Sequence, residues 1–272
     1  VWVENQPDPR WGNRNYSIIK LMDTRNRVVK QLSWKSRYMS AAISPDGKVK
    51  VKIYIGKSVE YSVFHQDDML LSKSPVSMTL TDGITLGLNS KLAKTTKKTV
   101  NGAIDAVIYK KSKITDNYNE LNFSFKEGFN VIFRAYNDGI AYRFTTNLKN
   151  PFELKNEQAV FNFPDDPKIF VAYVNDDNGQ KDTFEKQFNN SFENQYQHIL
   201  LSEWNPKRLA FLPLVIEGKN GKKMCITESD LLNYPGMYLH GNGSGALKGV
   251  FAPVPKEIKS GGHNMLQGLV QT

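Results

Sequence analysis

The chain has 272 residues and a mass of 30.9 kDa, and its 40% hydrophobic and 23% charged residues are typical of a globular protein with a buried core. Its net charge of +9 is concentrated at the start, because residues 1–38 carry eight Lys or Arg against three acids and so contribute +5. The remaining residues show no stripe of basic side chains interleaved with aromatics, which argues against a nucleic-acid partner.

Residues 1–42 form a basic leader in which no period predicts a helix or a strand. Trp2, Trp11 and Trp34 stand there in a setting rich in Pro and Asn. Two interpretations stay open: a basic arm of the protein, or a segment foreign to the folded body. The alternation of apolar residues begins only near Ile43, which favours the second, so we expect the body to span residues 43–272.

Strict alternation marks the first predicted strand, "KVKVKIYI" at residues 48–55, with its valines and isoleucines on one face. This pattern predicts a half-buried strand, and "SPDG" at 44–47 predicts the turn before it. Further on, "ELNFSF", "NVIFRAY" and "IAYRFTT" are separated by "KEGF" and "NDG", which predicts a meander of three consecutive strands.

Six later segments have the composition of short strands, and helical signals are scarce. We expect one helical turn within residues 182–190 and another at "SDLLNY", capped by Ser229. Many short strands separated by Gly, Asn and Pro turns predict an all-β, antiparallel sandwich. The six predicted strands are 159–163, 168–174, 208–217, 222–228, 236–241 and 246–254.

Several kinds of site are disfavoured by the residues present. Cys225 is the only cysteine, so there is no intrachain disulfide or cysteine zinc cluster, and its apolar neighbours predict a buried, inert thiol. The four histidines lack the spacing of a zinc site, no G-x-S-x-G motif is present, and "GNGSG" lacks the lysine of a phosphate loop. No run of 18 apolar residues predicts a membrane span.

Carboxylates are the remaining candidates for chemistry. Glu193 and Glu203 flank His198 in "FENQYQHILLSEW", where they fit a glycosidase carboxylate, a calcium ligand, or a solvated edge of the sheet. Glu228 and Asp230 precede the turn "YPG", and capping of that turn is favoured over a position in a cleft.

Four motifs in order, "SPDGKVKV", "YNELNFSF", "FRAYNDGIAYRF" and "ITESDLLNYPGMYL", resemble the N-terminal domain of glycoside hydrolase family 97 over residues 43–272. The family contains α-glucosidases and α-galactosidases. The resemblance implies a β-super-sandwich of the galactose-mutarotase type, which packs against a (β/α)₈ catalytic barrel that follows it in the chain.

The resemblance also implies a role for Glu193. In calcium-dependent, inverting members, one glutamate of this domain helps to hold calcium at the barrel, ten residues before the glutamate of a Leu-Ser-Glu. That position is Glu193 here, with Glu203 as a neighbouring structural acid, and the barrel and the oligosaccharide substrate would complete the calcium shell. The 272 residues end before such a barrel, so we expect no hydrolysis by this chain alone. The resemblance further implies a periplasmic or secreted protein.

Two alternatives stay open beside the α-glycosidase domain. The first is a stand-alone carbohydrate-binding sandwich that stacks sugars on Tyr136, Tyr173, Tyr196 or Trp204, although tyrosines at strand spacing are more often core residues. The second is a mutarotase-like enzyme, for which His198 beside Glu193 is the candidate pair. A sandwich without its barrel would expose its docking face, so the isolated chain is expected to self-associate.

Overall fold

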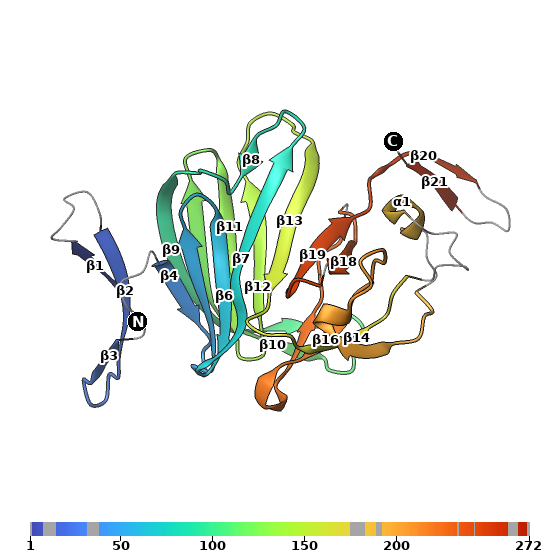
Figure 1. The fold of residues 1–272 in the computed structure, drawn as a ribbon. Coiled ribbons are helices and arrows are strands. Elements are labelled where there is room, and N and C mark those ends of the chain that lie inside the picture. Colours follow the sequence, from blue (N-terminus) through green and yellow to red (C-terminus); the bar gives the residue numbers. More distant parts are fainter. Residues whose placement is uncertain are drawn as a thin grey trace. The chain divides into compact units, whose positions relative to one another are not determined.

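A computed structural model describes residues 2–7, 15–31, 38–174, 183–188, 192–232, 234–241, 243–260 and 266–270. The chain forms two compact units, Val1–Ala159 and Val160–Thr272. Every strand pairing in the described residues is antiparallel, and helix is limited to α1 (Phe184–Gln187) and two 3₁₀ turns (Figure 1). The predicted all-β, antiparallel fold is therefore confirmed. Among the described residues there is no helix with the length and hydropathy needed to cross a bilayer.

The first unit contains a β-sandwich. One sheet has the order β13-β7-β6-β5-β4, and the other has the order β12-β11-β10-β9. Tyr61 of the first sheet contacts Phe133 and Tyr142 of the second, each at 5.7 Å between ring centroids. The strands are β4 (Tyr38–Ile43), β5 (Val49–Ile55), β6 (Val59–His65), β7 (Asp68–Leu80), β8 (Thr85–Leu86, paired with β7), β9 (Leu92–Asp105), β10 (Lys113–Phe125), β11 (Phe129–Tyr136), β12 (Ile140–Thr146) and β13 (Leu154–Asn162).

The predicted meander is present as β10, β11 and β12. In β11 buried and half-buried residues alternate along the whole strand, and Phe129, Val131 and Phe133 are fully buried. Its turns are tied to the rest of the sandwich, because the amide of Asp46 in "SPDG" donates to Oδ1 of Asn137 in "NDG" at 2.9 Å. Gly47 supplies the positive φ of 79° that the first of these turns requires.

The prediction of a half-buried strand at β5 is wrong, because Lys52 and Tyr54 on its second face are also buried. The strand is internal to the sheet, and long side chains cover this face. The ammonium of Lys52 lies 4.4 Å from the centre of the Phe64 ring. Burial and the nearby Lys52 charge lower the pKa of Lys50.

The leader contains strands that its sequence did not predict. A three-stranded sheet of order β1-β2-β3 is formed by Trp2–Pro7, Asn15–Met22 and Val29–Gln31. The strand β4 starts at Tyr38 and pairs with β5, so the sheet of the body includes residues before Ile43. Trp11 and Trp34 lie outside the described residues.

The described residues of the second unit contain strands of three sheets and a hydrophobic core. One cluster of its core consists of Ala172, Val174, Leu209, Phe211 and Tyr238, with Phe184, Phe188 and Val250 packed against it. One sheet has the order β15-β14-β16-β17, a second joins β18, β19 and the end of β13, and a third pairs β20 with β21. The elements are β14 (Lys168–Val171), β15 (Gln197–Leu200), β16 (Leu214–Glu217), β17 (Lys223–Ile226), β18 (Met237–Gly241), β19 (Ala246–Phe251), β20 (Pro255–Ser260), β21 (Leu266–Val270) and 3₁₀ turns at Leu201–Glu203 and Lys219–Gly221.

The two helix predictions have different outcomes. The turn expected within 182–190 is present as α1, whereas residues 229–232 of "SDLLNY" form no helix. Asp230 there has a positive φ of 61°, which is incompatible with a right-handed helical turn. Asn233 lies outside the described residues.

Candidate functional site

Glu193 lies in an irregular segment between α1 and β15 and is exposed. Both of its neighbours are attached to the second unit. The Phe192 ring contacts Phe211 edge to face at 5.3 Å, and Nδ2 of Asn194 donates to the carbonyl of Tyr173 at 2.5 Å. The segment therefore presents an exposed carboxylate between two fixed positions.

Glu203 has a local structural role, as expected. Its Oε2 accepts a hydrogen bond from the amide of Leu200 at 2.8 Å, which fixes the 3₁₀ turn Leu201–Glu203. The preceding residue, Ser202, donates hydrogen bonds from its amide and its hydroxyl to the carboxylate of Asp166, at 2.8 and 2.6 Å. The "LSE" motif is thus a braced turn between β15 and the buried Trp204.

His198 is on β15, where its ring stacks on Phe170 with centroids 4.0 Å apart and 14° between the planes. Its Nε2 lies 3.9 Å from Oε2 of Glu217, with both side chains partly exposed. Among the described residues, this carboxylate, and not Glu193, lies close enough to form an ion pair with a protonated His198. The contacts of His198 in the described residues therefore give no support to the pair expected for a mutarotase-like site.

Glu228 caps the "YPG" turn, which confirms the preferred interpretation. Both carboxylate oxygens lie 2.9 Å from the amide nitrogen of Met237, which donates to them. The carboxylate therefore closes the loop between β17 and β18. Asp230 is exposed within that loop.

Two of the four aromatic residues suggested as sugar platforms are not available for that role. Tyr173 and Trp204 are buried and meet edge to face at 5.2 Å. Tyr173 also accepts a hydrogen bond from the amide of Asn205 at 2.9 Å, and burial raises its pKa. Tyr136 is half-buried against Tyr118, whereas Tyr196 is exposed.

The prediction of a buried Cys225 is wrong, because the residue is exposed. It lies on β17, the last strand of its sheet, where Ile226 faces the core and Cys225 has the opposite orientation. Neighbouring protein atoms partly desolvate the thiol and raise its pKa.

The donor set does not form a complete metal site. Among the described residues, no group of three or more His, Cys, Asp or Glu side chains converges on one point. Calcium takes six to eight oxygen ligands, so Glu193 fits as one ligand of a shared site and not as a site by itself.

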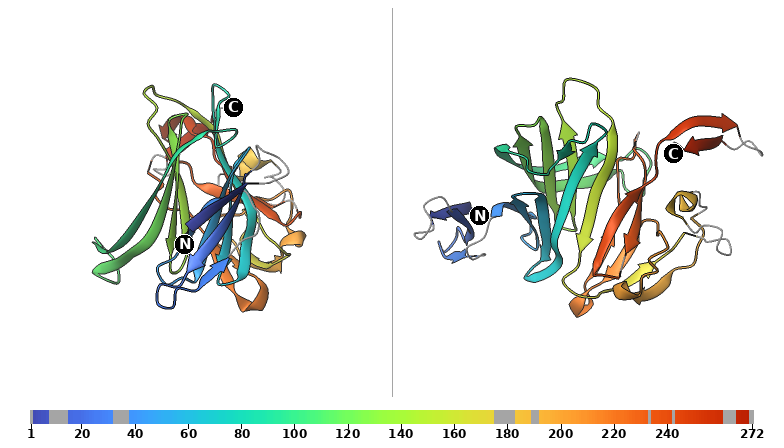
Figure 2. Two further views of the ribbon diagram at one scale, coloured as in Figure 1. Left: turned by 90° about the vertical axis from the view of Figure 1, so that its left-hand side faces the viewer. Right: turned by 45° about the horizontal axis from the view of Figure 1, so that its top comes forward.

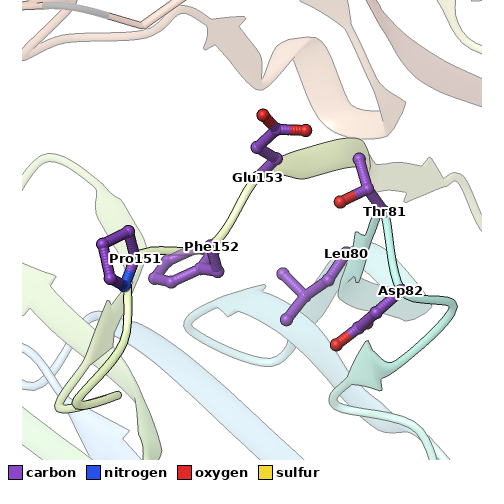
Figure 3. Close-up of a pocket in the computed structure, with 6 residues that line it drawn as sticks. All are labelled: Leu80, Thr81, Asp82, Pro151, Phe152 and Glu153. Carbon is purple, nitrogen blue, oxygen red and sulfur yellow. The ribbon is translucent and has the colours of Figure 1, made fainter.

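A depression on the first unit was not predicted from the sequence. It has a volume of about 370 Å³ and lies where the loop after β7 meets the loop before β13 (Figure 3). The amide of Thr81 donates to the carbonyl of Glu153 at 3.0 Å, and Oδ1 of Asp82 accepts from the amide of Ile84 at 2.9 Å. The lining residues are Leu80, Thr81, Asp82, Pro151, Phe152 and Glu153.

Comparison with known proteins gives consistent results. The family described as "Glycosyl-hydrolase 97 N-terminal" matches residues 43–262. A retaining alpha-galactosidase of Bacteroides thetaiotaomicron is 44% identical over 245 residues, which are 90% of this chain and 37% of the relative.

Two solved structures share the fold. A glycoside hydrolase family 97 enzyme from Pseudoalteromonas sp. strain K8, in complex with acarbose, matches with a TM-score of 0.66 and 17% identity, over 79% of this chain and 32% of that one. A beta-arabinopyranosidase matches with a TM-score of 0.68 and 21% identity, over 86% of this chain and 38% of that one. The chain therefore spans well under half the length of each of these proteins.

Proposed function

Because the chain belongs to the family of glycosyl-hydrolase 97 N-terminal domains, we propose that it forms the β-sandwich part of an α-galactosidase whose hydrolytic residues lie outside these 272 residues. The observation that carries the proposal is the 44% identity over 245 residues to the retaining alpha-galactosidase. The natural product would then cleave α-galactosides with retention, with the oligosaccharide bound mainly by a (β/α)₈ barrel, outside the cytoplasm.

The test compares this chain with the product of the intact gene, using p-nitrophenyl α-galactoside and α-glucoside as substrates. We expect no turnover by the 272-residue chain and turnover of the galactoside by the longer protein, with α-galactose as the first product in proton NMR. A longer protein that leaves the galactoside intact would refute the substrate proposal. Fractionation of the source cells checks the location, and activity confined to the cytoplasm would contradict it.

Within this enzyme, Glu193 would supply one oxygen ligand to calcium, and barrel carboxylates, substrate oxygens and water would supply the others. Support comes from the exposed carboxylate and from the fixed positions of Phe192 and Asn194 on either side of it. Bound calcium would polarise the oxygen atoms that it contacts. The calcium role of Glu193 is implied by a resemblance to inverting members, whereas the similar alpha-galactosidase is named retaining. Calcium binding by Glu193 is therefore tested separately from the substrate.

That test is calcium titration of the longer protein carrying Glu193→Gln, by calorimetry and by activity after chelation. We expect weaker calcium binding together with a higher calcium requirement for turnover. Glu185→Gln is the control, because Glu185 is also exposed and lies on the neighbouring helix α1. Equal calcium affinity in the wild type and in Glu193→Gln would remove Glu193 from the metal site.

The depression in Figure 3 favours a second candidate function, binding of carbohydrate by this chain alone. The exposed Phe152 provides an apolar wall, and Glu153, Asp82 and Thr81 provide polar groups at its rim. Sugars combine an apolar C–H face with hydroxyl groups, which suits such a combination. Titration of the chain with galacto-oligosaccharides should then show binding that Phe152→Ala removes, and an absence of binding by the wild type would rule this function out.

A further inference from the structure

The far end of the β9–β10 hairpin is a two-stranded ribbon, residues 101–117. Asn101–Asp105 pair with Lys113–Asn117, and the pairing of β10 with β11 begins only at Tyr118. Figure 2 shows this end of the hairpin extending beyond the strands beside it. Isolated two-stranded ribbons are marginally stable, so a long one in a folded domain calls for an explanation.

The end of the ribbon is ordered by specific contacts. Nζ of Lys113 lies 3.1 Å from Oδ1 of Asp105, and the amide of Ala106 donates to the carbonyl of Ser112 at 2.9 Å. Lower down, Oδ1 of Asn117 accepts a hydrogen bond from the amide of Gly102 at 3.0 Å. The loop beyond is therefore held on a defined base.

That loop is apolar and almost fully exposed. The ribbon tip, defined as Val107, Ile108 and Tyr109, has exposed fractions of 96%, 95% and 65%. Ile104 and Ile114 are paired directly across the ribbon just below the tip, and both are also exposed. Single exposed apolar residues are ordinary, but five gathered on one projection mark an interaction surface.

The surroundings of the tip are basic. Residues 94–113 contain six lysines and one aspartate, a net charge of +5, and three of the lysines lie within four residues of the tip. A partner surface should therefore combine an apolar hollow with acidic groups at its edge.

We propose that the ribbon tip docks into an apolar hollow, bordered by Asp and Glu side chains, on the catalytic domain of the longer protein. This inference rests on the proposed function, under which most of the polypeptide lies outside this chain, as the 37% coverage of the relative indicates. The ribbon is then a fixed contact between the sandwich and the domain that performs hydrolysis.

The order of residues along the ribbon favours a protein partner over a lipid surface. The ion pair of Lys113 with Asp105 lies between the tip and the Ile104–Ile114 pair. Covering the isoleucines with lipid would require this ion pair to enter the hydrocarbon, which is costly. A protein hollow can cover the isoleucines and still give the charges polar partners.

Hydroxyl-radical footprinting with mass spectrometry compares the oxidation of the tip in this chain and in the longer protein. We expect a several-fold loss of oxidation at Val107, Ile108 and Tyr109 in the longer protein, independent of protein concentration. Replacing both Val107 and Ile108 by Ser should restore oxidation of Tyr109 there without unfolding the domain, because both side chains are exposed. Lys126→Ser, at the opposite end of β10, is the control and should leave the protection unchanged.

Several results would overturn the proposal. One is equal oxidation in both proteins, and another is a gene that ends at Thr272. Protection that grows with the concentration of the 272-residue chain, with no gain in the longer protein, would assign the tip to a second copy. Protection that needs anionic phosphatidylglycerol vesicles would assign it to a membrane.

An α-galactosidase assay on the same samples separates this proposal from the proposed function. An active longer protein with an oxidised tip would refute the docking alone. A protected tip in a protein that does not cleave galactosides would refute the function alone.

Discussion

Replacing Gln187 by Met should destabilise the second unit by about 2–4 kcal/mol. Gln187 is fully buried in α1, where Nε2 donates to the carbonyl of Lys207 at 2.8 Å and Oε1 accepts from the amide of Leu209 at 2.7 Å. Met has a similar length and shape, so the packing is kept while both hydrogen bonds are lost. The buried Leu209 amide would be left without a partner, at about 1–3 kcal/mol, and the carbonyl of the exposed residue Lys207 would lose about 0.5–1.5 kcal/mol.

The assay is equilibrium unfolding in urea, followed by hydrogen exchange in the peptides that contain Leu209. With a slope of about 2 kcal/mol per molar urea, the transition should move by about 1–2 M to lower urea. Gln197→Met, at an exposed position of β15, is the control and should change the free energy of unfolding by less than about 0.5 kcal/mol. An equally small change for Gln187→Met would refute the claim that the buried amide clamps α1.

Four further outcomes follow from the described contacts. Gly241→Ala should lower the free energy of unfolding by about 1–3 kcal/mol in urea, since an added Cβ would lie 2.7 Å from Cγ of Trp204; unchanged stability would show that the Trp204 ring can shift. Burial raises the pKa of Tyr61, so the stability contributed by its neutral, buried phenol is complete below the unfolded pKa of about 10 and is lost as the pH rises above that value. The free energy of unfolding should therefore decline less steeply at high pH in Tyr61→Phe, and an identical decline in both proteins would contradict this. Cys225 should react with a thiol reagent in the native chain, slowly near pH 7 because its pKa is raised; no reaction before unfolding would contradict its exposure. The isolated chain should associate as its concentration rises, and light scattering that is independent of concentration would argue against an uncovered docking face.

Local patterns predicted the elements whose partners are close in sequence. The meander β10–β12 was identified because each turn joins strands that pair with each other, and β11 alternates over its full length. The strand β9 was not predicted, because its lysines and threonines are exposed on both sides and show no apolar alternation. Its place is set by pairing with β10, which the strand's own sequence does not reveal.

Burial was harder to predict than strand position. Lys52 resembles a solvent-facing residue in the alternation of β5, yet it is buried, and its ammonium lies over the ring of Phe64 on the next strand. Trp204 was a candidate platform for sugars, and it is a core residue because Tyr173 and Gly241, both more than 30 residues away, pack on it. In each case the deciding contacts come from segments that the local pattern does not contain.

In the candidate site, too, contacts between residues close in sequence were predicted and contacts between distant segments were not. The roles of Glu203 and Glu228 were predicted, because their partners Leu200 and Met237 are close in sequence. Nothing in the sequence indicated that Gln187 is buried and hydrogen-bonded, since a glutamine in a polar segment is usually exposed. Its partners, Lys207 and Leu209, are set by the packing of the second unit.

The surroundings of Glu193 bear on what its exposure means. A carboxylate that completes a site on another domain must remain outside its own core, yet must be held in place so that little ordering is needed when the site forms. The aromatic contact of Phe192 and the hydrogen bond of Asn194 satisfy the second condition, and the exposure of Glu193 satisfies the first. A surface glutamate without such a role does not need the residues before and after it in the chain to be held in place. This combination distinguishes Glu193 from Glu203, whose carboxylate is already used by the amide of Leu200.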